Sequence, residues 1–161
     1  MIPSVTRWSL AMARFCTAAW IGAAVLFVIV GVREVITPDF SSEVRDRLVA
    51  IRFPAYYIAG ATLTGMAFLA SAVAAMQSSS RGIRLALAAL AIAGALMAFD
   101  YVRIYSPLVA MITPPGQPRT AAFVTLHKSS MRINTAHLAA CLVAAIALSA
   151  TDGRRNDAPT V

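Results

Sequence analysis

Four long apolar runs constrain this 161-residue chain more than any other feature of its sequence. A helix needs about 20 mostly apolar residues to cross the hydrocarbon core of a bilayer, which is about 30 Å thick. Charged or proline-containing segments separate the runs, so each run is a candidate span. We therefore predict one domain, an all-α integral membrane protein in the form of a four-helix bundle with short loops, with spans at residues 15–32, 53–76, 85–105 and 131–150 and a flexible tail at 152–161.

The composition excludes most soluble classes. Hydrophobic residues make up 59% of the chain and charged residues 13%, whereas soluble domains are about 45–50% apolar. The formal charge of +7 comes mainly from arginines that flank the runs, so anionic lipid headgroups are the expected counter-charge and nucleic acid is not an expected partner. We expect a multi-pass protein of a bacterial inner membrane, in contact with the lipid bilayer, with a homo-oligomer or a membrane complex as possible assemblies.

The segments that connect the four apolar runs also predict local structure. Thr37-Pro38-Asp39 breaks the first helix, and Ser41 or Ser42 can cap a short interfacial helix. Pro54 suits the first turn of the second span, where its missing N–H costs nothing. The second connection, 77–82, is short enough for an antiparallel hairpin. The third, 113–118, is rich in proline and must lie outside the hydrocarbon.

Small residues recur at a spacing of four, as in Ala61 with Gly65 and Gly94 with Ala98. Such pairs predict close approach between membrane helices. The acid-free second connection carries Arg81 and Arg84, and the positive-inside rule therefore predicts that both termini are cytoplasmic.

Asp100 and Arg103 fall inside the third apolar run, where each charged group costs at least about 2.5–3.5 kcal/mol on insertion scales. The two are three residues apart, close enough to pair on one helix face. Two interpretations stay open. In one, Arg103 extends to the interface and Asp100 holds a neighbouring helix; in the other, both line a polar cavity that binds an ion or a proton.

A polar stripe follows one face of the fourth span. His127, Asn134 and Cys141 recur every seven residues, Ser130 lies on the same face, and His137 borders it. The stripe is either a set of interhelical hydrogen-bonding groups or a ligand site. The two histidines are about 15 Å apart along one helix, so they cannot hold one iron between them. We predict no metal site and no cofactor, although a soft-metal site that draws on Cys16, Cys141, methionine and histidine remains an alternative.

Three segments together resemble a known family. They are Ala19-Trp20-Ile21-Gly22 with Phe27, then Phe53-Pro54-Ala55-Tyr56-Tyr57, then Phe123 followed by Leu126-His127-Lys128-Ser129-Ser130-Met131-Arg132-Ile133-Asn134. In order and spacing, over about residues 10–150, they resemble the transmembrane-protein-205-like family, also catalogued as domain of unknown function 4149. The resemblance implies a four-helix membrane domain without an established molecular activity. The chain departs from the family's acidic-Pro-Arg turn after the third span, where it has Tyr105-Ser106-Pro107-Leu108.

These observations predict a polar cluster at one membrane face, because two spans end there and two begin there. The candidate ligand-binding residues, from the motifs and from the charged pair, are Trp20, Phe53, Pro54, Tyr57, Asp100, Arg103, His127, Ser130 and Asn134. We expect a non-enzymatic protein that binds a small ligand, ion or partner. The alternatives are a small transporter or channel, a metal-handling membrane protein, an enzyme or redox subunit that uses His127, and an accessory or assembly subunit of a membrane complex.

Overall fold

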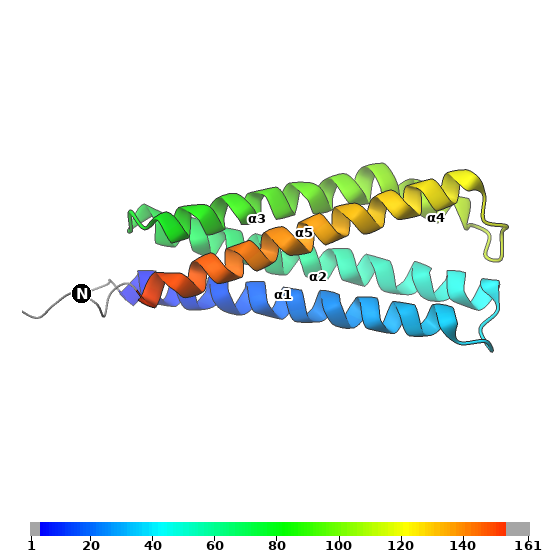
Figure 1. The fold of residues 1–161 in the computed structure, drawn as a ribbon, viewed down its shortest axis with the longest axis horizontal. Helices are drawn as coiled ribbons and strands as arrows, with labels where there is room; N and C mark the ends of the chain where they lie inside the picture. The colour runs from blue at the N-terminus through cyan, green and yellow to red at the C-terminus, as the bar shows by residue number, and fades with distance from the viewer. Residues whose placement is uncertain (1–3, 154–161) are drawn as a thin grey trace, which may run out of the picture.

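The computed structural model describes residues 4–153, with the backbone alone for the last two, as an elongated bundle of long helices that run side by side (Figure 1). No strand occurs in this part of the chain. The elements in chain order are α1 (Ser4–Ile36), α2 (Ser42–Met76), α3 (Arg81–Asp100), the π-helical turn η1 (Tyr101–Tyr105), α4 (Ser106–Met111) and α5 (Ala121–Gly153).

Four helical stretches are long and apolar enough to cross a membrane: Ser4–Ile36, Ser42–Met76, Arg81–Met111 and Ala121–Thr151. The predicted all-α four-helix bundle is therefore confirmed, and the chain is a multi-pass integral membrane protein. Each predicted span lies within one of these stretches. The start of α1 and the end of α5 lie at the same end of the bundle (Figure 1).

Arginines bound an apolar layer across the bundle. On the first stretch Arg14 and Arg33 enclose it, and on the third Arg84 and Arg103 enclose it. Both pairs are 19 residues apart, which is about 28 Å along a helix axis. That length matches the thickness of a bilayer core.

The helices contact one another in a closed ring, because α1 packs on α2 and α5, and α3 packs on the same two helices. The interior has two zones. Small side chains fill the zone near the start of α1, where Ala13, Ala86 and Ala144 are fully buried. Aromatic side chains fill the other zone, around Trp20 and Tyr57. Alanine lets helix backbones approach closely, whereas the aromatic side chains of the other zone fill more space between the helices.

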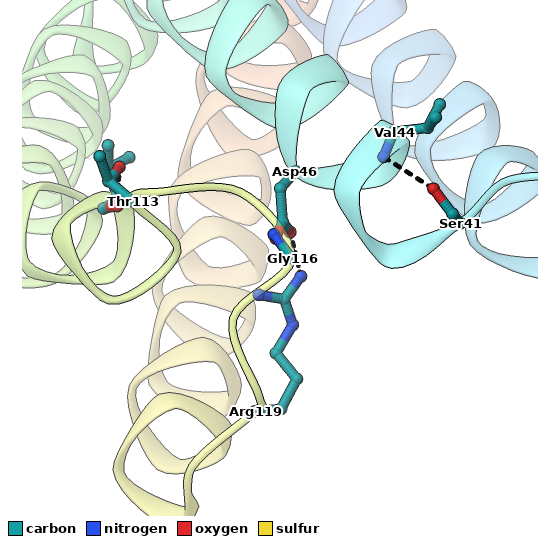
Figure 2. Close-up of polar contacts among 7 residues, drawn as sticks. Ser41, Val44, Asp46, Thr113, Gly116 and Arg119 are labelled. Atoms are coloured by element: carbon teal, nitrogen blue, oxygen red, sulfur yellow. Dashed lines mark hydrogen bonds and ion pairs between the residues drawn. The ribbon is translucent and has the colours of Figure 1, made fainter.

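The expected interfacial helix before the second span is not a separate element. α2 runs unbroken from Ser42 to Met76, with Pro54 inside it rather than in its first turn. Ser41 caps the helix by accepting a hydrogen bond from the Val44 N–H (Figure 2), and no helix breaker follows until Pro54. Proline removes one helical donor, a loss that membrane helices tolerate when their neighbours hold the backbone in place.

The third stretch also continues further than expected, past Tyr105 to Met111. Its α-helical pattern changes to a π turn over Tyr101–Tyr105, and the Ser106 N–H bonds the Tyr101 carbonyl, five residues back. Pro107 explains the change, because its ring lacks an N–H and collides with the carbonyl four residues earlier. A wider turn before the proline relieves that collision, and such turns are frequent at functional sites.

The connection between α4 and α5 is attached to α2 through one buried carboxylate. Asp46 is 1% exposed; its Oδ2 accepts the Gly116 N–H at 2.8 Å and its Oδ1 pairs with the Arg119 guanidinium (Figure 2). Gly116 has a φ of 90°, a conformation that glycine adopts without strain. Asp46 thus holds the predicted proline-rich loop against the end of the bundle.

Replacing Asp46 with alanine should free this loop. The change leaves the Gly116 N–H and the Arg119 guanidinium without their acceptor, and Arg119 is only 37% exposed. We expect a loss of about 1–3 kcal/mol in the opening free energy of the loop, seen as faster amide exchange over residues 113–120. Glu43→Ala is the control, because its pair with Arg47 is exposed on both sides and is worth less than about 1 kcal/mol. Equal exchange in the two variants would contradict the role of Asp46.

Gly60 provides a test of packing in the aromatic zone. A Cβ atom added there would lie 2.6 Å from Cη2 of Trp20 and would also collide with Met97. Gly60→Ala should lower the free energy of unfolding in mixed micelles by about 1–3 kcal/mol, since overpacking forces side chains to shift. Gly22→Ala, where a Cβ meets no atom within 4 Å, should be neutral or stabilising. Equal stabilities for the two variants would show that the zone is loosely packed.

Candidate functional site

A buried carboxylate forms the centre of the candidate site. Asp100, the last residue of α3, is 1% exposed and lies three residues inside Arg103, about 4.5 Å within the apolar layer. Its Oδ2 accepts three hydrogen bonds, from Tyr57 Oη at 2.5 Å, Ser130 Oγ at 3.1 Å and Asn134 Nδ2 at 3.1 Å. Its Oδ1 is buried and has no hydrogen-bond partner. One carboxylate thus joins α2, α3 and α5.

Asn134 extends this network to a second tyrosine. Its Oδ1 accepts the Tyr56 hydroxyl at 2.9 Å, while its Nδ2 donates to Asp100. Ser130 and Asn134 are four residues apart on α5, so both point at the same neighbour. We refer to Tyr56, Tyr57, Asp100, Ser130 and Asn134 as the Asp100 cluster.

A second network crosses the bundle beside the first. Trp20 Nε1 donates to His137 Nε2 at 2.7 Å, so the proton of the neutral imidazole is on Nδ1, which donates to the Ala93 carbonyl at 2.8 Å. His137 is 1% exposed, and both ring nitrogens are engaged. This arrangement fixes α1, α3 and α5 relative to one another. A satisfied, buried histidine of this kind is a structural element rather than a free ligand.

Aromatic rings surround the hydroxyls of the cluster. Phe53 stacks on Tyr105 with ring centroids 5.5 Å apart, and Tyr105 lies 4.8 Å from Tyr57. On the other side, Phe27 contacts Tyr56 at 4.4 Å. Tyr105 comes from the π turn η1, which therefore places one of its rings against α2. The rings create an apolar surrounding in which the Asp100 hydrogen bonds are stronger than in water.

The structure brings together only part of the predicted site. Tyr57, Asp100, Ser130 and Asn134 meet at one point, while Phe53 packs beside them and Trp20 binds His137 instead. The remaining three candidates, Pro54, Arg103 and His127, have exposed side chains.

Arg103 and His127 stay outside for separate reasons. Arg103 lies within the π turn, where helical spacing no longer holds, and no ion pair joins it to Asp100 within residues 4–153. His127 lies in the first part of α5, where residues 121–129 include no buried side chain, and it stacks on Phe123 with centroids 6.0 Å apart.

Two members of the networks were absent from the predicted site, Tyr56 and His137. A signal for His137 exists in the sequence, since it is four residues before the buried Cys141 and three after Asn134. A buried tryptophan also needs an acceptor for its N–H. Nothing in the sequence shows which of the two adjacent tyrosines reaches Asp100 and which reaches Asn134.

The chemistry of the site is that of oxygen and amide groups. In the part of the chain that the structure describes, no group of three or more His, Cys, Asp and Glu side chains is placed to hold a metal ion. Comparisons of the chain with protein-family profiles, with curated proteins and with solved structures found no match. The functional argument therefore depends on the geometry of the Asp100 cluster.

Tyr57→Phe removes the shortest of the three hydrogen bonds to Asp100. Because a buried carboxylate then loses a donor, we expect the free energy of unfolding in mixed micelles to fall by about 1–3 kcal/mol. Tyr101→Phe is the matched control, since Tyr101 is 45% exposed and contacts its neighbours through its ring. If both variants unfold alike, the Tyr57 hydroxyl contributes nothing specific.

Proposed function

We propose that this membrane protein binds a proton or a small cation inside its helix bundle, with Asp100 as the group that receives it. The observation that supports this proposal is the asymmetry of the carboxylate. Oδ2 accepts three hydrogen bonds, whereas the equally buried Oδ1 accepts none.

The charged form of Asp100 lacks a partner. A charged carboxylate at this depth needs a positive charge, and within residues 4–153 it makes no ion pair. A neutral form that carries its proton on Oδ1 also lacks an acceptor for that proton in the protein. A bound cation, or a proton carried with a water molecule, supplies what is missing. Intramembrane acidic residues commonly serve ion or proton binding for this reason.

Other functions have less support from the geometry. A transporter that uses Asp100, Arg103 and His127 as its path needs all three inside, and two of them are exposed. Roles as a metal-handling protein or as an accessory subunit stay predictions, as do the resemblance to the transmembrane-protein-205-like family and the bacterial inner membrane.

Asp100→Asn tests the proposal, because it keeps the size of the side chain and removes its charge and its acidic proton. We expect thermal unfolding of the wild-type protein in detergent to shift by several degrees with added Na⁺, and the shift to vanish in Asp100→Asn. His127→Ala should retain the wild-type response, since His127 is exposed. The same response in Asp100→Asn and in the wild type would contradict the proposal.

A further inference from the structure

Two cations on α5 lie on the side of the helix that faces away from the bundle. Lys128 and Arg132 are exposed, whereas Ser130 and Asn134, which alternate with them along the helix, bond to Asp100 in the interior. The two cations are four residues apart, so their Cβ atoms lie about 5–6 Å from each other. We refer to Lys128 and Arg132 as the α5 basic pair.

The face of α5 that carries the basic pair continues as an apolar surface. Leu142 and Ile146 follow Lys128 and Arg132 by about four helical turns, and they are 52% and 62% exposed. Exposed apolar side chains on a membrane-spanning helix lie against acyl chains, since lipid tails are as apolar as leucine. The basic pair is therefore the charged start of a lipid-facing surface.

The depth of the basic pair places it at the edge of the apolar layer. Because the residues on either side of Arg132 bond Asp100, Arg132 begins near the level of Asp100, about 4.5 Å inside Arg103. In a helix each Cα–Cβ bond leans toward the N-terminus, and α5 begins at the end of the bundle next to α4 (Figure 1). The Arg132 side chain therefore leans out of the hydrocarbon, toward Lys128 and the lipid headgroups.

No carboxylate of the protein neutralises the basic pair. Across residues 4–153, neither side chain makes an ion pair. No acidic residue precedes Asp152 on α5, and Asp100 lies on the interior side of that helix. Two like charges four residues apart destabilise a helix, and a cation at the depth of Arg132 is costly without a partner. An anion from outside the protein reduces both costs.

The surroundings of the basic pair indicate which anion fits. The phosphate of a lipid lies at the membrane boundary, where the two side chains meet, and basic groups there attract anionic lipids. Leu142 is ten residues beyond Arg132, about 15 Å along the axis, so an acyl chain of one leaflet spans the exposed surface between them. A headgroup that carries its own positive charge opposes one of the two cations. A lipid with a net negative headgroup matches both the charge and the apolar surface.

We propose that Lys128 and Arg132 form a binding site for an anionic phospholipid, with its phosphate between the two cations and an acyl chain along the lipid-facing side of α5. The site does not depend on ion binding at Asp100, because it lies on the opposite side of the helix.

Native mass spectrometry of the purified protein tests the proposal, because it counts the lipids bound to each chain. The probes are phosphatidylglycerol and phosphatidylcholine with the same acyl chains. The wild-type protein should bind the first phosphatidylglycerol about tenfold more tightly than phosphatidylcholine, and the double variant Lys128→Gln with Arg132→Gln should lose that preference.

The matched control is the double variant Arg33→Gln with Arg103→Gln. It removes the same charge from the same boundary of the apolar layer, but from other helices, and both arginines are exposed. It should bind phosphatidylglycerol as the wild-type protein does. Arg132→Lys keeps the charge and should retain the preference. Circular dichroism and thermal unfolding confirm that each variant is folded.

Three results would overturn the proposal: equal affinities of the wild-type protein for the two lipids, an equal loss of phosphatidylglycerol binding in the two double variants, or displacement of the lipid by inorganic phosphate. The last result would identify a site for free anions from the aqueous phase. Asp100→Asn should bind phosphatidylglycerol as the wild-type protein does, so failure of the ion site and failure of the lipid site give different outcomes.

Discussion

A carboxylate enclosed by lipid-facing helices must be satisfied by those helices, and the interior of this bundle is arranged around that requirement. Asp100 receives a hydroxyl from α2 and both a hydroxyl and an amide from α5, so three of the four long helices meet at one oxygen. Lipid offers no hydrophobic drive for helices to associate, so such polar contacts and close packing determine how they meet. A shift of any one of these helices breaks at least one bond to the carboxylate.

The remaining long helix, α1, is held in place by the second network. Trp20 on α1 binds His137, and His137 also binds the Ala93 carbonyl of α3. His137 is three residues beyond Asn134 on α5, so the two networks share that helix as their common support. Toward the other end, fully buried alanines pack the interior, and Arg14 donates to the Leu148 carbonyl near the end of α5. The buried networks around Asp100 and His137 and the alanine-packed zone therefore occupy different parts of the molecule.

The sequence allows the spans to be predicted because a bilayer imposes a length on any helix that crosses it, and the charge-free runs show that length directly. It also identifies Asp100, Ser130 and Asn134, since polar residues inside apolar runs are conspicuous. It does not reveal that Arg103 and His127 turn outward. Each is separated from the cluster by three residues, a spacing that suggests a shared face, but the π turn alters one geometry and the exposed start of α5 alters the other.

The apolar groove between α2 and α3 could not be predicted for a related reason. Ala61 with Gly65 and Gly94 with Ala98 have the spacing of close-packed helices, yet they line this groove, and a Cβ added to Gly65 or Gly94 would meet no atom within 4 Å. Only the positions of the neighbouring helices show whether such residues are packed or left open. The continuation of α2 through Pro54 could likewise not be predicted from the sequence. A proline at the start of a span and a proline within a longer helix have the same local sequence.

The unbroken α2 has a mechanical consequence. Asp46 and Tyr57 are eleven residues apart on one helix, about 16 Å along its axis. The first holds the outer loop through Gly116 and Arg119, and the second holds the buried carboxylate. The loop and the membrane interior are thus attached to one continuous helix, at points eleven residues apart. A rigid-body movement of α2 that withdraws Tyr57 from Asp100 would therefore also displace Asp46 and the loop that it holds.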